Sequence, residues 1–217
     1  MTSSRLVPKS HVSVTRKKTD EVAAFQATFA ERVKAKLPAD PHLPLKLWAM
    51  DETRLGLHTV RRRRITLRGV KPVGIHQQRF ENLYVYGAIA SASGESLFAL
   101  AKTMNGEKFQ IFLEQFAQAH AETMNVLLLD NSRTHMAKTL VVPANVVLVF
   151  QEPYAPELNP AERVWRALKD ALAWERWTCL ADLQDRLLEL IGGWTEEMLQ
   201  SLTSYPYIMA ALSAQST

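Results

Sequence analysis

Cysteine is nearly absent from this sequence of 217 residues, in which Cys179 is the single thiol. One cysteine cannot form a disulfide within the chain, which excludes a disulfide-stapled scaffold and favours a reducing compartment. Long hydrophobic runs are also missing, and no stretch approaches the roughly 18 apolar residues that a membrane span needs. The basic N-terminus lacks the apolar segment of a secretory signal. These absences predict a cytoplasmic protein that does not enter a membrane.

Histidine is scarce as well, and the six histidines and one cysteine give no spacing that is typical of a zinc site. Apolar residues, by contrast, make up 47% of the sequence, which is enough for a chain of this length to bury a full core. We therefore expect one domain over residues 41–217, preceded by a basic lead-in and linker helix over residues 1–40.

Acidic residues are missing from a segment in the first third of the chain. Between residues 57 and 80 there are seven Lys and Arg side chains and no acid: Arg61, Arg62, Arg63, Arg64, Arg68, Lys71 and Arg79. So dense a run is either a solvated basic loop or a contact surface for nucleic-acid phosphates. Residues 1–40 are also basic, with eight Lys and Arg against four acids, and this excess accounts for the whole formal charge of +4.

Hydrophobic periodicity predicts a helix and then several strands in the first half of the chain. After an extended stretch over residues 1–20, apolar residues recur at helical spacings of three and four, at Val22, Phe25, Phe29 and Val33. Strands are predicted over residues 45–50, 55–60, 64–67, 82–90 and 96–102. The first strand ends at Asp51, and the last two form a hairpin whose turn contains Gly94.

The second half alternates helix and strand before it becomes wholly helical. A helix begins at Asn105, with apolar residues at a period near 3.6: Phe109, Phe112, Leu113 and Phe116. Strands are predicted over residues 126–129 and 146–150. Asn159 is predicted to cap a further helix with Pro160 as its first residue. Two more helices are expected over residues 180–191 and 196–202.

This order of elements predicts an α/β fold, with a mixed sheet flanked by helices and a helical C-terminal end. A ribonuclease-H-like core has the same order, and it brings together acids on the first strand, the fourth strand and a following helix. Here these acids are Asp51, Asp130 and Glu162. Converging carboxylates are what a two-metal phosphoryl-transfer site needs. Each acid alone also has a structural explanation, as a strand-ending turn, a helix-dipole partner or a surface charge.

Three sequence words are more specific than this spacing: MDETRLGL at 50–57, DNSRTH at 130–135 and PYAPELNPAERVW at 153–165. They resemble the catalytic domain of bacterial insertion-sequence transposases of the mariner-type superfamily, the group with an Asp-Asp-Glu triad, over residues 45–190. The resemblance implies that Asp51, Asp130 and Glu162 are the catalytic, metal-binding triad, flanked by Asn131 and His135.

The same resemblance implies a cofactor, a substrate and partners. The triad would hold two Mg²⁺ or Mn²⁺ ions and act on double-stranded DNA, cutting at the ends of a transposable element and joining the freed 3′-hydroxyl to target DNA. A homodimer, with full-length transposase as a further partner, would bring two DNA ends together. In a bacterial cytoplasm, such a complex associates with the nucleoid when it binds DNA.

Arg166 and Lys169 lie four and seven residues after Glu162, so the predicted helix places them on the same face. They are candidates for phosphate contacts beside the metals, together with the basic run, and an ordinary solvated helix face explains them equally well.

Two features depart from the family pattern. Many relatives have a tryptophan shortly after the basic run, where this sequence reads RRRRITLRG. Full-length relatives also begin with a helix-turn-helix region, for which the first 40 residues are too few. The sequence is therefore expected to be a catalytic half alone. A non-catalytic derivative that binds DNA or the full-length enzyme and regulates transposition stays open as the alternative, and an RNA nuclease as a third function.

Overall fold

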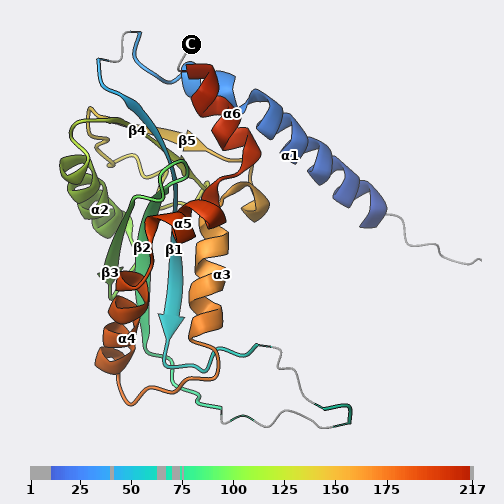
Figure 1. The fold of residues 1–217 in the computed structure, drawn as a ribbon, viewed down its shortest axis with the longest axis vertical. Helices are drawn as coiled ribbons and strands as arrows, with labels where there is room; N and C mark the ends of the chain where they lie inside the picture. Colours follow the sequence, from blue (N-terminus) through green and yellow to red (C-terminus); the bar gives the residue numbers. More distant parts are fainter. Residues whose placement is uncertain (1–10, 40–41, 63–66, 70–73, 75, 216–217) are drawn as a thin grey trace, which may run out of the picture.

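A five-stranded mixed sheet forms the centre of the protein (Figure 1). The computed structural model describes residues 11–39, 42–62, 67–69, 74 and 76–215. The strands are β1 (Leu45–Gly56), β2 (Asn82–Ala90), β3 (Ser96–Ala101), β4 (Met124–Leu129) and β5 (Val146–Phe150), in the order β3-β2-β1-β4-β5. β1 is central, because it pairs antiparallel with β2 on one side and parallel with β4 on the other.

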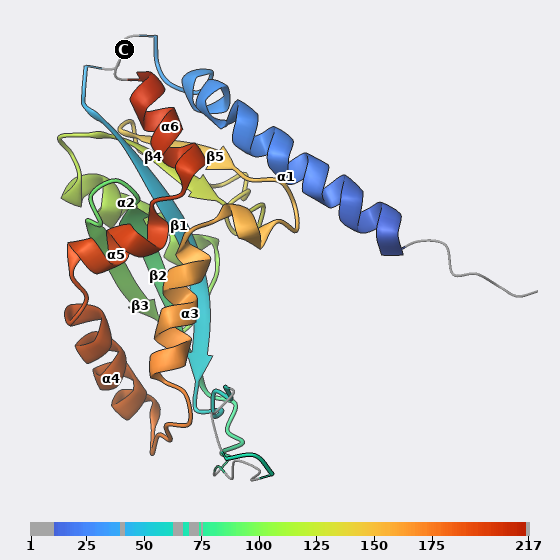
Figure 2. The same cartoon turned by 45° about the vertical axis from the view of Figure 1, so that its right-hand side comes forward.

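Helices cover both faces of this sheet (Figure 2). They are α1 (His11–Lys34), α2 (Gly106–Ala119), α3 (Ala161–Ala171), α4 (Leu180–Gly192), α5 (Glu196–Thr203) and α6 (Pro206–Gln215), with a short 3-10 helix η1 (Pro156–Leu158) before α3. Side chains of α2 pack on one face, and those of α1, α3, α4, α5 and α6 pack on the other. The predicted α/β fold with a helical C-terminal end is confirmed.

Alternation along β1 supplies both layers, because successive side chains of a strand point to opposite faces. Leu47 and Ala49 join the layer of α3 and α1, whereas Trp48 and Met50 join the layer of α2. All four are buried, and the burial of each large side chain contributes about 1.5–3 kcal/mol. The same alternation sends the next two residues, which are both acids, to different sides of the sheet.

Helix α2 begins as its sequence predicts. The side chain of Asn105 accepts a hydrogen bond from the backbone N–H of Lys108, which satisfies one of the unpaired donors at the helix start. The buried residues include the four at the predicted spacing: Phe109, Phe112, Leu113 and Phe116. The ring of Phe116 meets that of Trp48 edge-on, with centroids 4.9 Å apart. Helix α2 therefore covers the face of the sheet to which Trp48 and Met50 point.

Helix α1 is longer than predicted and lies beside α6 (Figures 1 and 2). The rings of Phe25 and Phe29 are 6.2 and 5.0 Å from that of Tyr207, and the three join a core with Val126 and Val149 of the sheet. The extended stretch predicted up to residue 20 is wrong from His11 onward. No proline or glycine interrupts residues 11–34, so the helix continues beyond the part that packs.

The strand predicted at 55–60 is not formed as a separate element. β1 itself runs to Gly56, and residues 57–60 follow without regular structure, joined to the chain before β2 by isolated bonds such as Thr59 N–H to Gln77 O at 3.2 Å. Residues 64–66 lie outside the described residues, and Leu67 is 82% exposed. Arg61 and Arg62, which follow residues 57–60, are exposed, as expected for charged side chains without buried partners.

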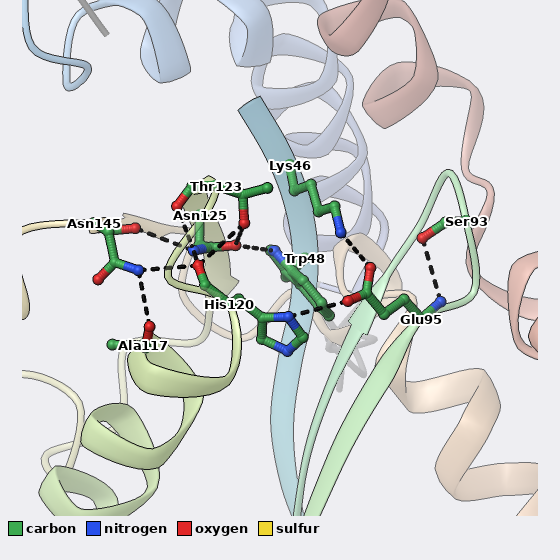
Figure 3. A network of polar contacts seen from close by, with 9 residues as sticks. All are labelled: Lys46, Trp48, Ser93, Glu95, Ala117, His120, Thr123, Asn125 and Asn145. Carbon is green, nitrogen blue, oxygen red and sulfur yellow. Dashed lines mark hydrogen bonds and ion pairs between the residues drawn. The ribbon is translucent and has the colours of Figure 1, made fainter. Parts of the chain in front are cut away.

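A polar network ties the start of β1 to its neighbours (Figure 3). Glu95, in the turn after β2, pairs with Lys46 and lies 3.1 Å from Nδ1 of His120 at the end of α2. Trp48 Nε1 donates to Oδ1 of Asn125 at 2.9 Å. Burial lowers the pKa of His120. None of the helices in the described ranges is long and apolar enough to cross a membrane.

Candidate active site

Three carboxylates from three elements line one cavity of about 320 Å³. Asp51 lies in the middle of β1, Asp130 follows the last residue of β4, and Glu162 is in the first turn of α3. The remaining wall is made by Asn131, Ser132, Gln151, Glu152, Pro153, Tyr154, Ala155, Pro156 and Asn159. The fold thus brings together the three acids that the sequence singles out, with Asn131 beside them.

Asp51 is held on the α3 side of the sheet. Its Oδ2 accepts a hydrogen bond of 3.0 Å from Nε1 of Trp165, which is fully buried in α3. Burial raises the pKa of Asp51 to about 7, and the negative charges of Glu52, Glu162 and Asp130 act in the same direction. The carboxyl group therefore resists ionisation where four acids approach one another, and a cation in the cavity would relieve this repulsion.

His135 bridges two acids on the other side of the sheet, and it is 1% exposed. Its Nδ1 lies 2.8 Å from Oδ1 of Asp130, and its Nε2 lies 2.9 Å from Oε1 of Glu52. Burial alone lowers the pKa of His135, but these two hydrogen bonds outweigh it and raise the pKa to about 10. In return, the hydrogen bond from His135 lowers the pKa of Asp130. The imidazole is thus a cation that fixes Asp130 by one oxygen.

Glu52 has a role that sequence reasoning missed. In the sequence it is only the acid next to Asp51 within the word MDETRLGL, whereas the structure places it on the opposite face of the sheet, bonded to His135. The signal was present in the alternation of β1, which must separate two adjacent side chains. The partner could not be identified, because it lies 83 residues away in the sequence.

Asn159 links β1 to α3. It is almost fully buried, its Nδ2 donates to the carbonyl of Met50 at 2.8 Å, and its Oδ1 accepts from the N–H of Ala161 at 3.1 Å. Helix α3 begins at Ala161, so the helix start is one residue later than predicted, although Asn159 still accepts a bond from the first turn. This side chain sets the position of Glu162 relative to Asp51, a role that helix capping alone does not predict.

Asn131 belongs to the wall of the cavity rather than to its centre. Its side-chain amide donates to the carbonyl of Gln151, which joins the chain after β4 to the chain after β5. Oε1 of Gln151 is buried and has no hydrogen-bond partner among the described residues. Gln151, which lines the cavity, therefore has one buried oxygen that the described residues leave without a hydrogen-bond donor.

The basic residues lie toward the other end of α3. Arg62 pairs with Asp170, and Nε of Arg166 lies 4.0 Å from the second oxygen of the same carboxylate. Arg61 and Arg68 are exposed, and Lys169 is half-buried. Arg63, Arg64 and Lys71 lie outside the described residues. Since Asp170 is eight residues beyond Glu162 on one helix, this cluster is about 12 Å along α3 from the acid site.

Oxygen donors of this kind suit Mg²⁺ or Mn²⁺, which prefer carboxylate ligands. The raised pKa of Asp51, to which the neighbouring acids contribute, fits a site that is completed by a cation. No group of three His, Cys, Asp or Glu side chains in the described part of the chain is already arranged to hold a metal ion. The carboxylates have the chemistry of metal ligands and share one cavity. They would have to move closer together to bind a cation.

Comparison with known proteins identifies the family. Residues 46–184 match a family model described as DDE superfamily endonuclease. The chain belongs to this family. It is also 30% identical over 118 residues to an uncharacterized protein, y4pE/y4sA, of Sinorhizobium fredii, an alignment that covers 52% of this chain and 83% of that protein. The predicted catalytic domain of the Asp-Asp-Glu type is therefore confirmed.

Solved structures of a mariner transposase resemble this DDE domain in fold. The Mos1 strand transfer complex has a TM-score of 0.65 at 16% identity, covering 100% of this chain and 66% of the Mos1 chain. The Mos1 mariner paired-end complex with Mn has a TM-score of 0.64 at 14% identity, covering 100% and 67%. The DDE domain thus spans about two thirds of the length of the Mos1 chains. This likeness confirms the predicted ribonuclease-H-like arrangement.

Proposed function

We propose that this DDE domain is the catalytic domain of a transposase, which cuts double-stranded DNA at the ends of a transposable element and transfers the strand to a target. The observation that supports it most is the shared cavity of Asp51, Asp130 and Glu162, which all lie within the residues that match the family model. The similar Mos1 structures are a strand transfer complex and a paired-end complex with Mn.

Asp51, Asp130 and Glu162 are proposed to hold two divalent cations, Mg²⁺ or Mn²⁺. When bound, such cations supply an activated water or 3′-hydroxyl and stabilise the leaving oxygen of the phosphodiester. The protein's own residues fix the ligands. Trp165 orients Asp51 through its Oδ2, and His135 occupies Oδ1 of Asp130, which leaves the other oxygen of Asp130 for the cavity.

Other side chains around the cavity are proposed to position Glu162 or to contact the phosphates of the DNA. Asn159 holds the start of α3 against β1, so that Glu162 faces the cavity from a fixed distance. Arg62 and Arg166 are proposed to hold the DNA backbone beside the site. Pairing of two copies, each on one DNA end, completes the proposal.

Calorimetric titration of Mn²⁺ tests the metal site without knowledge of the DNA sequence. Asp130→Asn should lose most of the binding, because it removes a ligand charge and keeps the side-chain shape. Asp185→Asn on α4, an exposed acid outside the cavity, is the matched control and should bind like the native protein.

Nicking of a supercoiled plasmid then tests catalysis. The native protein and Asp185→Asn should nick it in Mn²⁺, and Asp130→Asn should not. Equal metal binding by Asp130→Asn and the native protein, or plasmid nicking that survives Asp130→Asn, would contradict the assignment of the triad.

A further inference from the structure

Tyr154 has a backbone conformation that its side chain disfavours. Its φ is 58°, in the left-handed region that bulky residues rarely adopt. Among the described residues, only Tyr154 and Trp174 combine a side chain with positive φ. Such a conformation carries an energetic cost and persists only where the surrounding structure enforces it, which makes it informative about function.

The two residues differ in what the conformation achieves. The backbone N–H of Trp174 donates to the carbonyl of Val60 at 3.0 Å, and its ring packs against Gly74, where an added Cβ would lie 2.3 Å from it. The conformation of Trp174 thus serves packing. The side chain of Tyr154 is 92% exposed, and within the described part of the chain neither its ring nor its hydroxyl has a partner. Folding alone gives no reason to hold this ring in water.

The chain on either side fixes Tyr154 in place. Pro153 precedes it, and the next residue, Ala155, is buried together with Leu158 in the core beneath. Pro156 stiffens the following turn. Because its neighbours are anchored, the loop cannot relax to bring the ring inward, and the ring remains at the wall of the cavity that contains Asp51 and Glu162.

We propose that Tyr154 is a substrate-contacting residue that stacks on an unpaired nucleobase next to the phosphodiester held in the cavity. This inference rests on the proposed function, because the phosphate must enter the carboxylate cavity for a base to reach its rim. An aromatic ring can stack on the face of any base, so this contact does not depend on the DNA sequence. Bases inside a duplex are already stacked on both faces and offer no free face. The ring therefore favours a frayed or single-stranded DNA end over an intact duplex.

Replacing Tyr154 by glycine distinguishes a role of the ring in stacking from a role of the residue in folding. Tyr154→Gly removes the ring and adopts positive φ without strain, so the melting temperature should stay the same or rise. Tyr154→Phe keeps the ring and the strain. Phe80→Ala is the control, because Phe80 is a ring of similar exposure, 84%, near the start of β2.

Two DNA probes measure the effect, both with Ca²⁺ in place of Mg²⁺ or Mn²⁺, so that a cation occupies the carboxylates while no strand is cut. One is a duplex with a 3′ single-stranded overhang and 2-aminopurine at the first unpaired position, and the other is the blunt duplex. Tyr154→Gly should bind the overhang probe roughly 5- to 150-fold more weakly and lose the quenching of 2-aminopurine, with less than about a twofold change on the blunt probe. Tyr154→Phe and Phe80→Ala should keep the native ratio of the two affinities.

Several results would overturn the inference. Equal losses on both probes with a lower melting temperature would show a structural role. A loss in Tyr154→Phe that matches Tyr154→Gly would assign the contact to the hydroxyl rather than to the ring. Native affinity and quenching in Tyr154→Gly would exclude stacking while the proposed function stands. A native protein that binds neither probe would overturn the inference together with the proposed DNA substrate.

Discussion

Replacing Asp51 by asparagine should stabilise the protein in the absence of metal. Burial and the charges of Glu52, Glu162 and Asp130 raise the pKa of Asp51 from 3.8 to about 7. About three pKa units correspond to at most about 4 kcal/mol between the folded and unfolded states once the carboxyl group is ionised. Asparagine has the same shape and can still accept the hydrogen bond from Trp165, so the substitution removes the charge alone.

The raised pKa of Asp51 determines how the stability of the native protein changes with pH. An acid whose pKa is higher in the folded state stabilises that state fully below the unfolded pKa, and this stability is lost as the pH rises through the folded pKa. For Asp51 the loss falls between about pH 4 and pH 7. The Asp51→Asn protein should therefore resemble the native protein near pH 4 and exceed it at pH 8, by about 10 °C or less in melting temperature.

Thermal unfolding at pH 4 and pH 8, with and without Mn²⁺, is the assay. Mn²⁺ should raise the melting temperature of the native protein at pH 8 and leave that of Asp51→Asn nearly unchanged. Asp185→Asn, which changes an exposed acid, controls for the loss of one charge and should follow the native protein. A melting temperature of Asp51→Asn at pH 8 at or below the native value would refute the argument that the carboxylates repel one another.

Three further predictions concern the residues around the cavity. His135→Ala should lower the free energy of unfolding by about 3–5 kcal/mol in urea denaturation at pH 7, because Glu52 is left buried without its partner, and a loss below 1 kcal/mol would contradict this. Asn159→Ala should cost about 1–3 kcal/mol in the same assay, because the carbonyl of Met50 loses its donor, and an unchanged denaturation midpoint would count against the link between β1 and α3. Arg166→Ala should weaken binding to all DNA duplexes alike and reduce the slope of affinity against salt by about one in fluorescence anisotropy, whereas an unchanged slope would exclude a phosphate contact.

Local patterns in the sequence predicted the elements that carry the site. Apolar runs identified the strands that carry or precede Asp51 and Asp130, although β1 continues past Asp51 to Gly56, and the word around Glu162 identified the start of α3 to within one residue. Each of these signals depends on residues that are close in the sequence, such as a run of buried side chains or a capping residue. The order of the elements was then sufficient to predict that the three acids lie close together.

Contacts between distant residues could not be predicted in this way. The bond from Asn159 to Met50 joins positions 109 residues apart, and no periodicity of either segment encodes it. The separate strand predicted over residues 55–60 is wrong for a related reason. Its apolar residues have the alternation of a strand, but β2 pairs with β1 only as far as Gly56, where Asn82 is the last partner. Whether a strand forms there depends on that partner, which the local sequence does not contain.

The distribution of charge explains why the cavity, and not the core, is where a cation belongs. Glu52 and Asp130 share the positive charge of His135, whose ring lies on the α2 side of the sheet, and Glu152 in the cavity wall pairs with Arg32. Asp51 and Glu162 lie on the α3 side, where no lysine, arginine or histidine of the described chain pairs with them. A protein that only needed stability would replace such an unbalanced pair with apolar residues. Because His135 balances Asp130 and Glu52, and Arg32 balances Glu152, the charges of Asp51 and Glu162 remain unbalanced at the cavity, where metal binding can convert their repulsion into affinity.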